Sequence, residues 1–281
     1  MRPHTAGTRN GVSPTNRRSV GVIGVGHVGR ITRDALTRGA HVVAYDVVEG
    51  TRYPESEFAK CDYLIVCVNT PSLPGGGADL SPVRAAFEQM PPEVPVVLRS
   101  TVPPGTTDLL ARHYRRPVIF WPEYIGETNF VVQTMDQLHT APFQVVGAER
   151  SPAFSRWLDL IAEIYGPLVR FYRVTPVEAE IIKYMENCFF AVKTTFVNEF
   201  RSLCDAFDAD WQAVREGWLL DPRVERDHSD AFRSAPGYGG KCLPKDVAAL
   251  LDRAGEIGAP RPLLDAVRTI NAAHSPASAH R

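Results

Sequence analysis

The sequence has no apolar run that approaches the roughly 20 residues of a membrane-spanning helix. It also has no excess of either charge, because 31 basic and 32 acidic residues give a formal net charge of -1. This balance offers no electrostatic attraction to nucleic acid or to an anionic membrane. Residues 1–18 lack the apolar core of a signal peptide, so we expect a disordered tail.

Cysteine is scarce, and its spacing is not that of a disulfide framework or a zinc site. We therefore expect no metal site and a reducing, cytoplasmic location. The five cysteines are Cys61, Cys67, Cys188, Cys204 and Cys242. The 281 residues suffice for two domains that each bury a core of their own.

A glycine-rich turn follows the first apolar segment. Residues 19–24 are predicted to form a strand, residues 28–36 a helix, and residues 41–46 a second strand that ends in Asp46. This order of strand, glycine turn, helix and terminal acid is typical of a dinucleotide-binding unit, although a glycine turn alone can also serve packing.

The terminal acid also indicates which dinucleotide is bound. Asp46 can accept hydrogen bonds from both ribose hydroxyls and would repel a 2′-phosphate, which favours NAD over NADP. Arg52 nearby weakens that preference without reversing it. The predicted cofactor contacts of this unit are Gly24, Val25, Gly26, His27, Val28, Gly29, Asp46 and Arg52.

Four further apolar segments extend the predicted sheet, at residues 63–68, 94–98, 118–121 and 143–147. The first three are each followed by polar residues, at the carboxyl edge where ligands bind in such sheets. The fold class predicted for residues 19–150 is therefore α/β, a Rossmann-like doubly wound sheet that binds the cofactor.

Residues 151–281 are predicted to form an all-helical domain. An amphipathic helix over 152–164 and a short strand over 168–172 precede a helical pattern that runs from Pro176 through Phe207 without glycine or further proline. Such a length indicates a central dividing helix. On it Lys183 and Asn187 stand four residues apart and share one face. The pair could be an ordinary surface lysine and asparagine, or could face a site.

Cys242 lies between a glycine turn and the start of a predicted helix, in Ala235-Pro-Gly-Tyr-Gly-Gly-Lys-Cys-Leu-Pro-Lys-Asp246. Unpaired backbone N–H groups at a helix N-terminus, together with Lys241 and Lys245, would favour a thiolate. Asp246 follows four residues later and could orient a base or a water near the sulfur. The local features fit a nucleophilic cysteine and a buried structural cysteine equally.

The segment Gly-Tyr-Gly-Gly-Lys-Cys-Leu-Pro-Lys-Asp resembles the active-site signature of the UDP-glucose/GDP-mannose dehydrogenase family. Asn69-Thr-Pro, Ser100-Thr-Val-Pro-Pro-Gly-Thr, Pro122-Glu-Tyr-Ile-Gly-Glu and the Lys-x-x-x-Asn of the long helix are similar to further motifs of that family. Without the resemblance, Thr101 and Thr107 would be interpreted as helix caps, and Glu123 and Glu127 as solvated carboxylates.

The resemblance implies a role for each matching residue. The catalytic residues it implies are Cys242, Lys183, Asn187, Asp246, Glu123 and Thr101. Further contacts to NAD would come from Val68, Asn69, Thr70, Ser100, Thr101, Glu127 and Lys245. The substrate would be bound by Glu123, Tyr124, Ile125, Lys183, Asn187, Arg223, Arg233, Tyr238 and Gly239. For Arg223, which in the family reaches the sugar nucleotide of a neighbouring subunit, and for Arg233, solvated surface charge is the alternative.

The implied activity is the NAD-dependent, four-electron oxidation of the primary alcohol of a nucleotide-linked sugar to a carboxylate, through a cysteine-bound intermediate. The family normally continues into a second Rossmann-like domain that grips the nucleotide, and the resemblance implies that this chain lacks it. A homodimer through the long helix is expected to complete the substrate site.

Several alternatives stay open. The substrate could be smaller or of nucleoside type, or a separate partner chain could be required. The reaction could be a two-electron β-hydroxyacid oxidation, which needs no nucleophilic cysteine. The chain could also be a catalytically silent NAD-binding partner.

Overall fold

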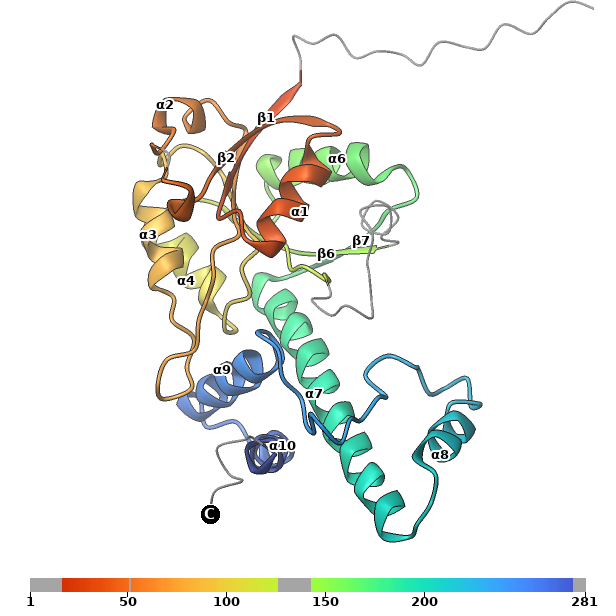
Figure 1. The fold of residues 1–281 in the computed structure, drawn as a ribbon. Helices are drawn as coiled ribbons and strands as arrows, with labels where there is room; N and C mark the ends of the chain where they lie inside the picture. The colour runs from red at the N-terminus through yellow and green to blue at the C-terminus, as the bar shows by residue number, and fades with distance from the viewer. Residues whose placement is uncertain (1–16, 51, 126–142, 275–281) are drawn as a thin grey trace, which may run out of the picture.

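The computed structural model describes residues 17–50, 52–125 and 143–274. Its strands form one sheet in the order β2-β1-β3-β4-β5-β6-β7, in which all neighbours are parallel except β5 and β6 (Figure 1). The strands are β1 (Arg18–Ile23), β2 (Ala40–Tyr45), β3 (Tyr63–Val66), β4 (Val96–Leu98), β5 (Val118–Phe120), β6 (Phe143–Gly147) and β7 (Arg170–Val174). The strand order reverses between β1 and β3, which is where such sheets bind their ligands.

Helices cover both faces of the sheet. One face carries α1 (His27–Leu36) and α6 (Pro152–Tyr165), and the other carries α3 (Ser81–Gln89) and α4 (Thr106–Tyr114). The short η2 (Val47–Glu49) and α2 (Glu55–Phe58) lie between β2 and β3. Strand β3 is apolar along its whole length because both of its faces are covered: Tyr63 and Ile65 enter the core under α6, and Leu64 and Val66 enter the core under α3.

The helix α7 (Pro176–Ala206) connects the sheet to the helical part. It begins at a capping box in which Thr175 and Glu178 bond each other's backbone N–H groups. The start of α7 packs so closely on β6 that a Cβ at Gly147 would lie 2.7 Å from the Cβ of Ala179. This contact fixes the direction in which α7 leaves the sheet.

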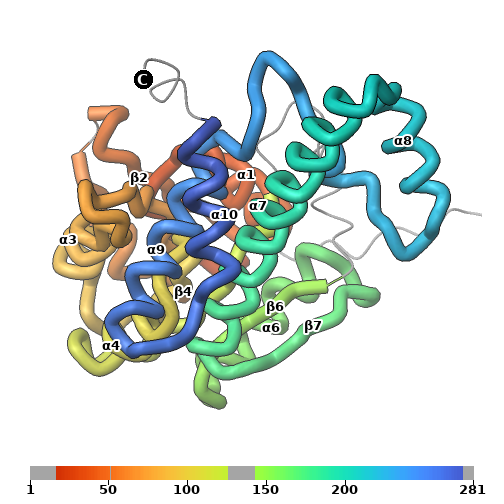
Figure 2. The backbone as a smooth tube through the Cα atoms, turned by 90° about the horizontal axis from the view of Figure 1, so that it is seen from below, coloured from red at the N-terminus to blue at the C-terminus, as the bar shows by residue number. Residues whose placement is uncertain are grey.

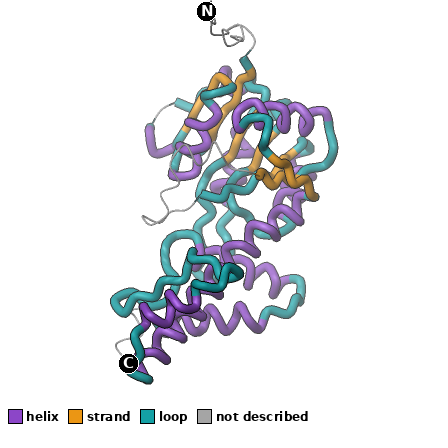
Figure 3. Tube along the Cα trace, turned by 90° about the vertical axis from the view of Figure 1, so that its right-hand side faces the viewer, coloured by secondary structure: helices purple, strands orange, loops and turns teal. Residues whose placement is uncertain are grey.

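The remaining helices are α8 (Trp211–Trp218), α9 (Leu243–Glu256) and α10 (Pro262–Ala273). Helices α9 and α10 pack alongside the first half of α7, whereas α8 folds back at its far end (Figures 1 and 2). Figure 3 shows the strands gathered in one half of the molecule and only helices and loops in the other.

The predicted fold class is confirmed: a Rossmann-like sheet is followed by a helical region with a long central helix. The sheet, however, continues to Val174, because β7 pairs in parallel with β6 and α6 packs on the same face as α1. The division between sheet and helical part thus falls at Thr175, against residue 150 in the sequence analysis. Strand β1 begins at Arg18, and residues 1–16 of the expected tail lie outside the described residues.

Candidate active site

The turn between β1 and α1 contains three glycines, and two of these positions require glycine. Gly24 has φ +88°, and a Cβ there would lie 2.9 Å from the backbone of Cys67. A Cβ on Gly29 would lie 1.8 Å from the carbonyl oxygen of Gly24. Among the described residues nothing lies within 4 Å of a Cβ placed on Gly26. The turn is therefore closely packed at Gly24 and Gly29 and open at Gly26, which fits a pyrophosphate bound at the N-terminus of α1.

Asp46 holds this turn against the end of β2. One carboxylate oxygen accepts a hydrogen bond from the backbone N–H of Val25 at 2.6 Å, and the other accepts one from Val48 at 2.9 Å. Each oxygen keeps a second lone pair, so the carboxylate can still accept a ribose hydroxyl. His27 and Arg52 are exposed, and Val28 is half-buried.

Side chains connect the carboxyl ends of β3 and β4. The hydroxyl of Ser100 donates to the carbonyl of Val68 at 2.7 Å, and that of Thr70 donates to the carbonyl of Thr101 at 2.8 Å. The Lys245 ammonium of α9 donates to the Thr70 hydroxyl at 3.3 Å. The helical part therefore reaches the predicted cofactor edge, where Asn69 is exposed.

Helix α7 presents a buried polar face to three other segments. Glu180, Lys183 and Asn187 follow one another at i, i+3 and i+7, so they line one side of the helix. Their exposed fractions are 0%, 4% and 6%. The Lys183 ammonium lies 3.2 Å from a carboxylate oxygen of Glu123, and the Asn187 amide donates to Asp246 at 2.6 Å. The predicted Lys–Asn pair is therefore inside the molecule.

The charge of Lys183 is set by its neighbours. Burial lowers its pKa, but the carboxylates of Glu123, Glu186 and Asp246 together raise the pKa above its ordinary value. The Glu186 carboxylate lies 3.5 Å from the ammonium, and burial raises the pKa of Glu186. The ammonium is thus charged at neutral pH and can stabilise negative charge on a bound oxygen.

The strand-end loop after β5 holds Glu123 in place. Its second carboxylate oxygen accepts from the backbone N–H of Ile125 at 2.6 Å. The ring of Tyr124 lies beside Lys183, with 5.3 Å between its centroid and the ammonium nitrogen. Glu127 lies outside the described residues.

Cys242 is the N-cap of α9 and is half-buried. The backbone N–H of Asp246 donates to the Cys242 carbonyl at 2.9 Å, which places the two side chains one turn apart at the same helix end. The Asp246 carboxylate, 1% exposed, accepts from both Asn187 and Lys245. The Asp246 carboxylate, the Asn187 amide and the Lys245 ammonium therefore form one hydrogen-bonded cluster at the helix end where Cys242 stands.

The glycine turn before Cys242 is anchored by two other helices. Asn271 of α10 accepts from the Tyr238 backbone N–H at 2.7 Å and donates to its carbonyl at 3.0 Å, while Asn198 of α7 accepts from Gly237 at 3.1 Å. The Tyr238 ring is buried in the helical core, and Gly239 is exposed. The substrate contact of Tyr238 stays a prediction, and the structure places its ring against the helical core.

The two predicted substrate arginines lie apart from the cluster. Arg223 has an 87% exposed side chain and pairs with Asp221. Arg233 pairs with Asp205, near the end of α7. At 1.5 Å per helical residue, Asp205 lies roughly 30 Å along the helix from Lys183. Arg233 therefore lies far from Lys183 in the same chain, and its contact with a substrate stays a prediction.

Four polar residues that support the site were not predicted from the sequence: Glu180, Glu186, Asn198 and Asn271. Glu180 offered a usable signal, since a carboxylate three residues before Lys183 lies on the same helix face. Thr107, predicted as a helix cap, lies in the first turn of α4, and its hydroxyl donates a hydrogen bond to Glu180 at 2.6 Å.

In the part of the chain that the structure describes, none of the helices is long and apolar enough to cross a membrane.

Two models of one protein family match consecutive parts of the chain. The NAD binding domain of the UDP-glucose/GDP-mannose dehydrogenase family matches residues 45–169, and the central domain of that family matches residues 177–273. The chain belongs to this family. It is a member of a family of nucleotide-sugar dehydrogenases, and its Rossmann-like part is the NAD-binding domain.

Individual proteins similar to this chain belong to the same family. UDP-glucose 6-dehydrogenase of Rickettsia prowazekii (strain Madrid E) is 32% identical over 225 residues, covering 75% of this chain and 49% of the relative. That of Rhizobium meliloti (strain 1021) is 32% identical over 253 residues, covering 82% of this chain and 55% of the relative. The chain thus spans about half the length of these curated relatives.

Solved structures share the fold. A UDP-glucose dehydrogenase from Pyrobaculum islandicum superimposes with a TM-score of 0.79 at 27% identity, covering 93% of this chain and 70% of that chain. Mycobacterium tuberculosis 3-hydroxyisobutyrate dehydrogenase superimposes with a TM-score of 0.67 at 15% identity, covering 92% of this chain and 93% of that chain, which shows the fold alone.

Proposed function

We propose that this chain catalyses the NAD-dependent, four-electron oxidation of the primary alcohol of a nucleotide-linked sugar to a carboxylate. The observation that carries the proposal is the position of Cys242 at the N-terminus of α9, one helical turn before Asp246, whose carboxylate accepts a hydrogen bond from the Asn187 amide. A thiol there suits a reaction in which an aldehyde must be held between two oxidations.

NAD, when bound, accepts a hydride from the reacting carbon in each of the two oxidations. In the first, the alcohol loses its proton to a water held with Asp246, and the Lys183 ammonium and the Asn187 amide stabilise the alkoxide oxygen. Loss of the hydride leaves the aldehyde. The carboxylates around Lys183 raise its pKa and so keep it charged for this role.

In the second stage the Cys242 thiolate attacks the aldehyde carbon and forms a thiohemiacetal, whose oxygen faces the same two donors. Loss of a second hydride gives a thioester. A water activated by Glu123 or Asp246 then displaces the thiolate and releases the carboxylate. In sum, one alcohol, two NAD and one water give one carboxylic acid and two NADH, with two protons released.

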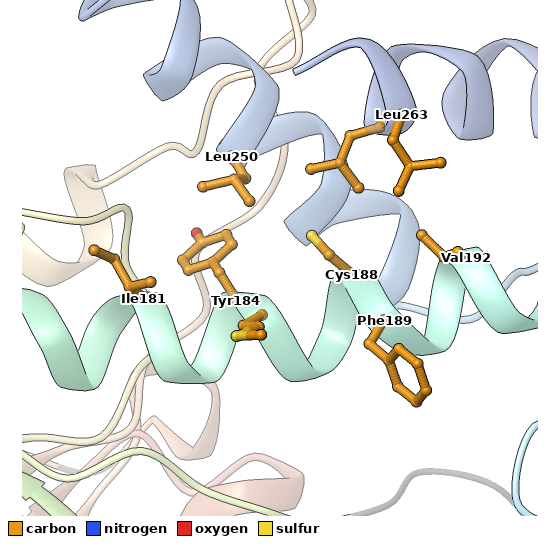
Figure 4. A pocket seen from close by; sticks show the side chains of 9 residues that line it. Ile181, Tyr184, Cys188, Phe189, Val192, Leu250 and Leu263 are labelled. Atoms are coloured by element: carbon orange, nitrogen blue, oxygen red, sulfur yellow. The ribbon is translucent and has the colours of Figure 1, made fainter. Parts of the chain in front are cut away.

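We also propose that two copies of the chain associate through α7. Helix α7 exposes Met185 and Phe189 beside an apolar groove that α9 and α10 border. In Figure 4, Tyr184 and Cys188 point towards Leu250 and Leu263, whereas Phe189 points away from them. A second copy would cover this face and bring Arg223 to the site of its partner. Light scattering after size exclusion, with Met185→Glu as the disrupting variant, tests the dimer.

The experiment that tests the activity measures NADH formed per carboxylate for the wild type and Cys242→Ser, over a panel of UDP-, GDP- and ADP-sugars and free nucleosides. Two NADH per carboxylate, lost in Cys242→Ser, would support the four-electron reaction and name the substrate. One NADH per turnover with an unaffected serine variant would favour the two-electron β-hydroxyacid reaction. NAD binding without turnover would favour a silent partner subunit.

A further inference from the structure

A buried polar contact between α7 and the start of α4 is made by a residue with no role in the reaction above. The carboxylate of Glu180 accepts hydrogen bonds from the backbone N–H of Gly105 at 2.5 Å, the backbone N–H of Thr107 at 2.7 Å and the Thr107 hydroxyl at 2.6 Å. It has no exposed surface. These donors include two of the N–H groups at the start of α4, so Glu180 caps that helix from α7.

The start of α4 has no local substitute for this cap. The N-cap position is Gly105, which has φ +92° and no side chain to accept a hydrogen bond. A Cβ there would be strained by the left-handed backbone and would lie 3.3 Å from Arg253. The carboxylate that satisfies these amides must therefore come from another element.

Helix α9 holds the same turn from the other side. The guanidinium of Arg253 donates to the carbonyl of Pro104 at 3.0 Å. The turn is thus bonded to α7 through Glu180 and to α9 through Arg253. These are the two helices that carry Lys183 and Cys242.

The turn is joined to the predicted cofactor edge by a short and stiff segment. Only Val102, Pro103 and Pro104 separate Thr101 from Gly105, and the two prolines restrict the backbone. The Val102 side chain is completely buried. A shift of Gly105 would consequently be transmitted to Thr101 and Ser100 with little loss.

We propose that Glu180 is a positioning residue that sets the distance between the 100–107 segment and the Lys183–Asn187 face of α7. The three residues stand on one side of α7, and each bonds a different segment: the start of α4, the Glu123 loop and the start of α9. The inference rests on the proposed function, because in it Glu180 aligns the predicted cofactor edge with the side chains that act on the substrate.

The test compares Glu180→Gln with Glu178→Gln, which is the matched control. The Glu178 carboxylate belongs to the capping box of the same helix and bonds only Thr175 among the residues described, so its loss weakens the start of α7 without touching α4. A glutamine at 180 presents one oxygen and one NH₂ group to three donors, so at least one donor loses its acceptor.

We expect Glu180→Gln to lower kcat by about 10²-fold, the scale of a misplacement near 1 Å. The dissociation constant of NADH should change less than about 3-fold, and hydrogen exchange of the Gly105 and Thr107 amides should become faster. Glu178→Gln should leave kcat and that exchange unchanged. The kcat of Thr107→Val should lie between those of the wild type and Glu180→Gln. The kcat of Thr107→Ser, which keeps the hydroxyl, should equal that of the wild type.

An unchanged kcat in Glu180→Gln, or an equal loss in Glu178→Gln, would overturn the inference. If Glu180→Gln does not fold, Thr107→Val against Thr107→Ser decides the same question. If the wild type oxidises no sugar in the panel, the proposed function fails. In that case the exchange rates of the Gly105 and Thr107 amides and the fluorescence of bound NADH still test the positioning role. Values in Glu180→Gln equal to those of the wild type would overturn that role, and different values would support it.

Discussion

The Lys183 ammonium lies 3.2 Å from the Glu123 carboxylate, and both side chains are buried. Taking two charges out of water is costly, and their mutual attraction offsets that cost only while both are present. A paired lysine at this position is therefore a fixed positive charge, held between Glu123 and Glu186.

Removal of the Glu123 charge should destabilise the protein, because it leaves the buried Lys183 ammonium without its nearest carboxylate. We expect Glu123→Gln to lower the free energy of unfolding by about 3 kcal/mol, the lower end for a broken buried pair, since Glu186 remains near Lys183. Urea unfolding at neutral pH measures the change. Glu123→Gln combined with Lys183→Met should regain part of the loss, and a single-variant loss below about 1 kcal/mol would show that the pair is solvated.

Two glycines of the turn between β1 and α1 should affect different properties, Gly26 the affinity for NADH and Gly29 the stability of the fold. Gly26→Ala should leave the melting temperature unchanged, because its φ of -66° suits alanine and the new methyl group meets no described atom within 4 Å. It should weaken NADH binding at least about 10-fold, since the methyl group would occupy the approach to the α1 N-terminus. Fluorescence titration of NADH measures this.

Gly29→Ala is the contrasting variant, because its methyl group would collide with the Gly24 carbonyl. We expect it to unfold at a clearly lower temperature. Equal NADH affinity of Gly26→Ala and wild type would mean that the cofactor does not approach the turn closely.

The cysteines should differ in reactivity. Cys242 is half-buried at a helix N-terminus, where a thiolate is favoured, whereas burial raises the pKa of Cys67 to about 11 and that of Cys188 to about 12. Iodoacetamide at pH 7.5 should therefore label Cys242 first, and peptide mass spectrometry should find Cys242→Ser unlabelled over the same time. Labelling spread evenly over several cysteines would contradict this expectation.

The burial of Glu180 should leave a signature in the pH dependence of the free energy of unfolding. Burial raises its pKa from 4.5 to about 7, although its bonds from Thr107 and Gly105 oppose the rise. The folded protein then holds the proton more tightly than the unfolded chain does. This contribution is complete below pH 4.5 and is lost as the pH rises through about 7.

The measurement is the free energy of unfolding of wild type and Glu180→Gln between pH 4.5 and 8. The advantage of the wild type over the variant should shrink as the pH rises, because the other titrating groups are common to both proteins. Two parallel curves would indicate that Glu180 titrates at its ordinary pKa.

Local patterns were sufficient to predict the Rossmann-like sheet, the long helix and the Cys242 helix end. Asp46 and the three glycines form a motif within one strand–turn–helix unit, and the apolar runs identify the buried strands. The fold class therefore followed from short-range order, with each element close in sequence to its neighbours.

Contacts between distant segments could not be predicted in the same way. The pairing of β7 with β6 depends on where α6 packs, which the pattern of α6 itself leaves open. The spacing of Glu180 from Lys183 indicates the helix face on which it lies, but its partners lie more than 70 residues away and could not be predicted from that spacing. The bonds of Asn271 to the Tyr238 backbone and of Arg233 to Asp205 likewise join segments far apart in sequence.

The close contact of Gly147 with the start of α7 bears on how the molecule can move. Swinging α7 about Thr175 would separate Ala179 from β6 and break the Glu180 cap at once. We therefore expect the sheet and the first turns of α7 to move as one rigid unit. Any opening of the site should then come from the loops or from α9, without a tilt of the long helix relative to the sheet.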